Sequence, residues 1–203
     1  MEHGADINKE DIFGTTPLNI ACCNGHIEVV KYLVEKGADI NIKTIMGETP
    51  LFTTCQNGHI DVVKYLVEHG ADINKEKNNG STPLYIACGN GHIEVVKYLV
   101  EHGADINKED NDGATPLYIA CQEGHIDVVK YLVEHGADIN KGNNNGSTPL
   151  YIACQNGYIE VVKYLIDHIA DVDKVINKKK RKRKYTINYC YFGKKSKFGE
   201  IFS

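Results

Sequence analysis

The sequence predicts an all-α solenoid built from five copies of one 33-residue unit. Thr-Pro-Leu recurs with a constant spacing of 33 residues, at Thr16, Thr49, Thr82, Thr115 and Thr148. Gly-His recurs in the same register at residues 25, 58, 91 and 124, and Gly-Ala-Asp-Ile-Asn at residues 37, 70, 103 and 136. A fixed period of this size is the signature of a repeat array in which each unit buries its apolar face only against its neighbours.

Residues 77–109 show the structure expected of one unit. A turn at residues 78–80 precedes Thr82, which suits the N-cap of a short helix, and the proline that follows suits its first position. Gly91 separates this helix from a second, longer one, which Gly103 ends. Both glycines can adopt the positive φ that ends a helix. The unit is therefore a turn, a short helix, a longer helix and an exit loop.

These features closely resemble the ankyrin repeat, and residues 110–142 match its motif D-x-x-G-x-T-P-L-H-x-A-A-x-x-G-H-x-x-V-V-x-x-L-L-x-x-G-A-D-x-N. The main departures in this unit are Tyr118, Cys121 and Tyr131. The five units cover residues 11–43, 44–76, 77–109, 110–142 and 143–175. Their near-identity is similar to that seen in the expanded ankyrin families of parasitic protists. The family's histidine after Thr-Pro-Leu is replaced throughout, by Asn19, Phe52, Tyr85, Tyr118 and Tyr151.

Both ends of the array depart from the period. Residues 1–10 repeat only the last part of a unit, so the first full unit is expected to expose apolar surface. We expect the chain to be a fragment of a longer array; alternatively, a partner or a second copy covers this end. In the last unit Ile169 replaces the glycine that ends the second helix. Because a β-branched residue resists positive φ, this helix either ends differently or runs on towards a basic tail at residues 176–203.

Composition indicates a protein of a reducing compartment, cytoplasmic or nuclear. The chain has no run of 18 apolar residues and begins without an apolar leader, so neither a transmembrane segment nor a secretory signal is expected. One cysteine recurs in each unit, and stacked helices are too far apart for these to form disulfides. A ladder of small buried thiols is therefore expected at Cys22, Cys55, Cys88, Cys121 and Cys154, with Cys23 and Cys190 outside it.

The sequence favours neither catalysis nor a metal, cofactor or small-molecule site. Its nine histidines recur once per unit at the two ends of the second helix, and rungs about 10 Å apart cannot converge on one zinc ion. We expect hydrogen bonding at helix ends and compensation of the helix dipole instead. These histidines are His26, His59, His92 and His125 at the start of the helix, and His3, His69, His102, His135 and His168 at its end.

The positions that differ between units are the candidates for binding a protein partner. The ankyrin resemblance implies contacts through the turn tips and the exposed side of the first helix. The first two tips are apolar and the later three are rich in Asn, and an exposed apolar patch suggests a contact site. The candidate residues are Ile12, Phe13, Ile45, Met46, Asn78, Asn79, Asn111, Asp112, Asn144 and Asn145 at the tips, and Gln56, Gln122 and Gln155 on the first helices.

A separate candidate is the basic tail. Residues 176–203 hold ten Lys or Arg and one Glu, a charge of +9, which leaves −13 on residues 1–175 of a chain whose net charge is −4. Its core is the run Lys178, Lys179, Lys180, Arg181, Lys182, Arg183 and Lys184. Such a run is typical of nuclear import signals and of patches that bind nucleic acid or anionic membrane, but also of a simple solvated terminus.

The sequence thus predicts a non-catalytic scaffold or adaptor that binds a protein partner through the array. The alternative is a nuclear or nucleic-acid-associated factor that acts through the basic tail. The identity of the partner lies beyond the sequence, because one repeat scaffold supports many unrelated binding surfaces.

Overall fold

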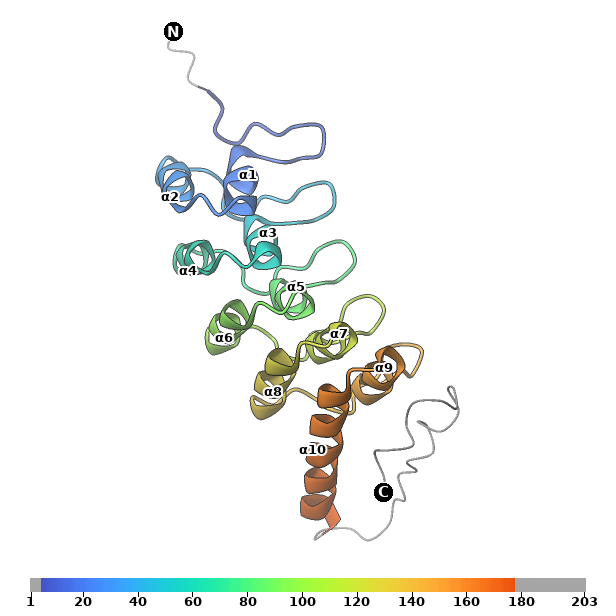
Figure 1. Ribbon diagram of the computed structural model, residues 1–203. Helices are drawn as coiled ribbons and strands as arrows, with labels where there is room; N and C mark the ends of the chain where they lie inside the picture. The colour runs from blue at the N-terminus through green and yellow to red at the C-terminus, as the bar shows by residue number, and fades with distance from the viewer. Residues whose placement is uncertain (1–4, 178–203) are drawn as a thin grey trace.

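The computed structural model describes residues 5–177, with side chains to residue 168, as five helix pairs stacked into one curved array (Figure 1). The first helices are α1 (Pro17–Cys23), α3 (Pro50–Asn57), α5 (Pro83–Gly89), α7 (Pro116–Glu123) and α9 (Pro149–Asn156). The second helices are α2 (Ile27–Glu35), α4 (Ile60–Glu68), α6 (Ile93–Glu101), α8 (Ile126–Glu134) and α10 (Ile159–Asn177). Residues 5–177 contain no strand, and the predicted all-α solenoid is confirmed.

The helices begin and end at the threonine caps and the glycines that the sequence predicts. In every unit the threonine hydroxyl accepts a hydrogen bond from the backbone N–H three residues later, at 3.1–3.3 Å, so each first helix has a side-chain N-cap. In α1 the side chain of Asn19 also accepts from the backbone N–H of Thr16, which completes a capping box. The glycine between the helices has positive φ, from 69° at Gly25 to 80° at Gly157.

The core is a set of rows that run along the stack rather than a single centre. The leucine after Thr-Pro is at most 1% exposed in the first four units, and a leucine of the second helix is fully buried in the last four. The predicted thiol ladder is confirmed at Cys22, Cys55, Cys88 and Cys121, which are buried, whereas Cys154 is half-buried. Burial raises the pKa of the Cys22 thiol to about 12. Cys23 is exposed, and Cys190 lies outside the described residues.

Neighbouring units are joined by side-chain hydrogen bonds as well as by apolar packing. Nε2 of His59 lies 2.9 Å from the carbonyl oxygen of Cys23, and His92 and His125 reach the same position of their preceding units at 3.0 and 2.9 Å. The expected hydrogen bond at a helix end is present, but it joins two units. Compensation of the helix dipole does not apply to these histidines, because they stand at the N-terminus of their helix, where a positive charge is unfavourable.

The histidines at the other end of the second helix bond within their own unit. Nδ1 of His69, His102 and His135 lies 2.7 Å from the carbonyl oxygen of the tyrosine four residues earlier. Each imidazole also stacks on that tyrosine ring, with centroids 3.8–3.9 Å apart. These histidines therefore close the last turn of the helix.

The last helix departs from the pattern at the expected residue. The sequence left open whether this helix ends differently or runs on. The structure shows that it runs on, because α10 continues through Ile169 to Asn177. The boundary assigned at residue 175 therefore falls inside a helix. Within residues 5–177, no helix is both long enough and apolar enough to cross a membrane.

Candidate partner-binding surface

Each turn tip is a tight turn closed by its own backbone. In the first unit the N–H of Gly14 donates to the carbonyl of Asp11 and the N–H of Asp11 donates to the carbonyl of Thr15, both at 3.0 Å. The carboxylate of Asp11 accepts from the N–H groups of Phe13 and Thr15, both at 2.8 Å. The hydrogen bonds from Thr15 and then Phe13 hold the pKa of Asp11 below its ordinary value.

Successive tips are hydrogen-bonded to one another, so that together they form a continuous ridge along one side of the array (Figure 1). The N–H of Ile45 donates to the carbonyl of Phe13 at 3.0 Å, and that of Asn78 to the carbonyl of Met46 at 3.2 Å. The last two junctions repeat this bond at 2.9 Å, from Asn111 to Asn79 and from Asn144 to Asp112. We call this structure the tip ridge.

Three of the predicted binding residues have a structural role in the tip ridge. The side-chain N–H of Asn78 donates to the carbonyl of Ile45 at 2.9 Å, and Asn111 and Asn144 do the same to the preceding tips at 3.2 and 3.1 Å. The sequence shows only that Asn recurs at this register position; the hydrogen bonds themselves depend on how the units stack. The neighbouring Asn79 caps its own turn, because its side-chain oxygen accepts from the N–H of Ser81 at 3.2 Å. All four remain exposed.

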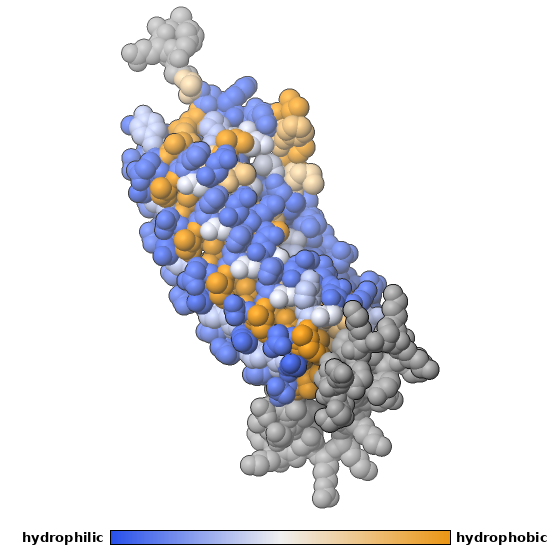
Figure 2. Space-filling view, in the orientation of Figure 1, coloured by the Kyte–Doolittle hydropathy of each residue, from blue (hydrophilic) through white to orange (hydrophobic). Residues whose placement is uncertain are grey.

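The apolar tips lie at the surface. Ile12 is 87% exposed, Phe13 57%, Ile45 61% and Met46 55%. Figure 2 shows a hydrophobic patch on the side of the array where the first loops project. The alternative that these side chains fold over one another, or over the uncovered end, does not fit exposures above one half. Because the N–H of Ile45 is bonded to Phe13, the two pairs lie on adjacent tips.

A partly buried ion pair fixes the second tip to the third unit. Nζ of Lys77 lies 2.6 Å from a carboxylate oxygen of Glu48, and both side chains are less than a quarter exposed. The same ammonium group stands 5.4 Å from the ring centroid of Phe52, which is 2% exposed. The sequence reasoning did not identify this pair, because its members are 29 residues apart in different units.

The remaining candidates lie at the ends of the first helices and on the later tips. Gln56 and Gln155 are exposed and Gln122 is half-buried, while Asp112 and Asn145 are exposed at their tips. The backbone carbonyl of Gln56 is taken by Asn90 and His92 of the next unit, so that only its side chain is available to a partner. In Figure 1 the first helices lie between the tips and the second helices, so these glutamines are set back from the tip ridge.

No other kind of site emerges from the described residues. Within residues 5–177 no three His, Cys, Asp or Glu side chains gather where they could hold a metal ion. The run Lys178–Lys184 lies outside the described residues. The array therefore offers an extended surface with apolar and polar sections.

Comparison with known families agrees with this architecture. The family described as ankyrin repeats (3 copies) matches residues 43–110 and 106–177, and the one described as ankyrin repeats (many copies) matches residues 1–53. The chain therefore belongs to the ankyrin repeat family. No curated protein matches it. Ankyrin repeats are in general modules of protein–protein interaction and typically have no enzymatic activity.

Proposed function

We propose that this protein is a non-catalytic scaffold or adaptor that binds a protein partner through the tip ridge and the adjoining ends of the first helices. The observation that carries the proposal is the exposure of Ile12, Phe13, Ile45 and Met46 on two adjacent tips. Removal of such side chains from water contributes on the order of 1–2 kcal/mol each. Apolar and aromatic anchors at the centre of an interface supply most of its binding energy.

The tip ridge favours binding because its backbone is already ordered. Each tip is closed by its own hydrogen bonds and joined to the next tip, so that a partner does not have to order a loop on binding. The polar tips of units three to five and the three glutamines then serve as the hydrogen-bonding border of the same surface. A reducing compartment, cytoplasmic or nuclear, is consistent with the buried thiols.

The test replaces the two largest apolar side chains. The double variant Phe13→Ser, Met46→Ser is compared with the wild type and with a matched control, Asp112→Ser, Asn145→Ser, on the later tips. Proteins cross-linked to each form in cell extract are identified by mass spectrometry. We expect recovery of the specific partner to fall at least ~10-fold for the apolar double variant and much less for the control. Equal recovery from all three, with helix content unchanged in circular dichroism, would contradict the proposal.

The alternative function rests on the sequence of the tail alone. Deletion of residues 178–203, followed by imaging in cells, tests it: an unchanged distribution removes the import hypothesis, and loss of salt-dependent RNA binding supports the nucleic-acid hypothesis.

A further inference from the structure

The chemistry of the tip ridge changes along the array from apolar to acidic. The third residue of each unit stands at the same place on successive tips and is exposed in every copy. From the first tip to the fifth these residues are Phe13, Met46, Asn79, Asp112 and Asn145. Figure 2 shows the change on this side of the array, from orange where the first loops project to blue further along.

The apolar section of the ridge is exposed within the assembled array. The second tip stands between the first and third units, and Ile45 and Met46 are still more than half exposed there. Their backbone groups are already bonded: the N–H of Ile45 donates to the preceding tip, and the carbonyls of Ile45 and Met46 accept from Asn78. A strand of a partner would find these groups taken. A partner therefore binds this section through side chains.

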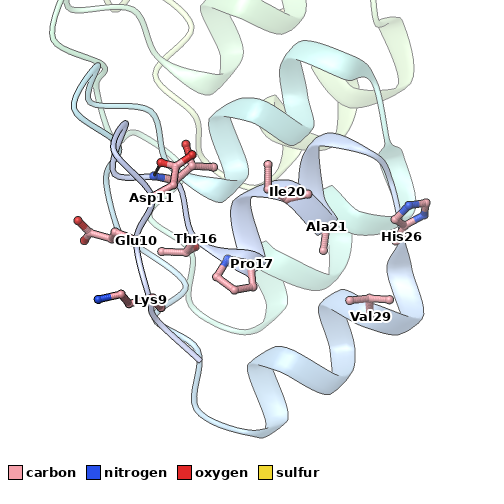
Figure 3. A pocket seen from close by; sticks show the side chains of 10 residues that line it. Lys9, Glu10, Asp11, Thr16, Pro17, Ile20, Ala21, His26 and Val29 are labelled. Atoms are coloured by element: carbon pink, nitrogen blue, oxygen red, sulfur yellow. Dashed lines mark hydrogen bonds between the residues drawn. The ribbon is translucent and has the colours of Figure 1, made fainter. Parts of the chain in front are cut away.

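The surface formed by the tips and the first helices carries an excess of negative charge. The first five residues of each unit and the first helices together contain one lysine, Lys77, and the carboxylates of Asp11, Glu48, Asp110, Asp112 and Glu123. Lys77 is already paired with Glu48, at 2.6 Å. Asp11 stands on the first tip (Figure 3), where its carboxylate accepts from N–H groups of its own turn.

The carboxylates that face water without a cation are concentrated in the fourth unit. Asp110 accepts from the N–H groups of Asp112 and Ala114 of its own turn, at 3.0 and 2.9 Å. Asp112 and Glu123 are exposed, one on the tip and the other at the end of α7. No side chain within residues 5–168 forms an ion pair with either. The fourth unit stands between the third and the fifth, so this charge also belongs to the surface of the assembled array.

We propose that the partner binds through a segment with apolar side chains at one end and lysine or arginine at the other, laid along the tip ridge. Its apolar side chains contact Phe13 and Met46, and its basic side chains contact Asp112 and Glu123. Stacked helices are about 8–10 Å apart, so the two parts of the segment are separated by roughly 20 Å, the distance of two units. The inference rests on the proposed function and adds the chemistry and the orientation of the partner.

The two parts of the contact contribute differently to binding. Burial of the apolar side chains supplies most of the affinity. Exposed ion pairs add less, but they raise the association rate and fix which end of the segment lies on which units. A segment in the reverse orientation would place its basic end on the apolar tips and lose this attraction. Because the carboxylates are exposed, salt screens their contribution and leaves the apolar one.

The probe is a random peptide library displayed on phage and selected on the immobilised full-length protein. Peptides of about 20 residues span roughly 30 Å even as a helix, which is enough to reach from the first tip to the fourth. We expect the selected peptides to be enriched in aromatic or aliphatic residues in one half and in lysine or arginine in the other. The dissociation constant of a selected peptide is then measured by fluorescence anisotropy.

Charge reversal separates the two parts of the contact. The double variant Asp112→Lys, Glu123→Lys should raise the dissociation constant at least ~5-fold in about 50 mM salt and much less in about 500 mM. The matched control, Glu101→Lys, Glu134→Lys, makes the same change of net charge at exposed ends of the second helices α6 and α8 and should bind like the wild type. All four positions are exposed, so the fold should tolerate the changes, which circular dichroism checks.

Three kinds of result overturn the proposal. The first is a library that yields no peptide, or peptides without basic enrichment. The second is an equal effect of the two charge variants, or an effect that salt does not reduce. The third is binding that appears only after deletion of residues 178–203, because the basic end of the chain would then be the occupant. Loss of peptide binding in Phe13→Ser, Met46→Ser leaves the proposed function standing in the second case, whereas unchanged binding in that variant contradicts the proposed function itself.

Discussion

Val29 and Val95 occupy the same position of the repeat, yet one is about half exposed and the other is buried. Their helices have the same sequence over nine residues, so neither propensity nor amphipathic pattern distinguishes them. The difference comes from the neighbouring helices: α3 and α4 of the second unit cover Val95, whereas within residues 5–177 no helix pair stands on that side of Val29. In a solenoid, burial is therefore a property of the junction between units, as expected for an array stabilised by nearest-neighbour contacts.

The largest expected effect on stability comes from replacing each valine by a charged residue. Val95→Asp should lower the free energy of unfolding by about 4 kcal/mol or more, because the carboxylate is placed in the apolar junction. Val29→Asp should cost less than about 0.5 kcal/mol, since the side chain remains in water. Urea unfolding followed by circular dichroism measures both. Similar losses for the two variants would mean that the side chain of Val29 is covered in solution.

Cys22 and Cys23 extend the comparison to adjacent residues. Burial raises the pKa of Cys22 from 9.0 to about 12, which lowers its thiolate fraction by about a thousandfold, whereas Cys23 is exposed. Brief alkylation of the native protein at pH 8, read by peptide mass spectrometry, should therefore modify Cys23 and spare Cys22. In urea both thiols should react. Equal alkylation rates of Cys22 and Cys23 in the native protein would show that the packing around Cys22 opens readily.

Two turn glycines give a smaller contrast. Gly80 and Gly146 both have positive φ, of 83° and 77°, so an alanine at either is strained by about 1–2 kcal/mol. A Cβ at Gly80 would also lie 2.6 Å from the side chain of Asn111 and 2.7 Å from its backbone N, whereas nothing lies within 4 Å at Gly146.

Gly80→Ala should therefore cost about 1 kcal/mol more than Gly146→Ala in thermal or urea unfolding. Equal losses of unfolding free energy would indicate that the backbone of the tip ridge shifts easily to accommodate the added methyl group. They would weaken the argument that the tip ridge is ordered before binding.

The smallest effect concerns pH at the first tip. The folded pKa of Asp11 lies below 3.8, so the hydrogen bonds it accepts contribute to stability above that value and are lost as the pH falls through the folded pKa. The amide signals of Phe13 and Thr15 should titrate below pH 3.8 in nuclear magnetic resonance, and should not titrate in Asp11→Asn. The fifth tip carries Asn143 at this position, with the same two bonds to Asn145 and Ser147, and is an internal control.

Most of the fold could be predicted because its determinants are local. The threonine caps, the glycines and the apolar pattern each act within one unit, and five copies of the same signal agree. Glu48 and Lys77 show where this reasoning stops, since a contact between units 29 residues apart has no local signature. The tip asparagines show the same limit: their residue type indicated a polar surface, but the hydrogen bonds to preceding tips depend on how the units stack.

The sequence by itself determined the unit, its helices, the stacking order and the positions at which units differ, because a repeated pattern of caps and apolar residues has one consistent solution. Only the tertiary structure decided which copies of a given residue are covered. It also decided whether α10 stops at Ile169, and that Ile12, Phe13, Ile45 and Met46 stay in water on a backbone held by neighbouring tips. The physical reason is that burial and hydrogen bonding between units depend on the neighbour, which differs at the two ends of a chain of nearly identical parts.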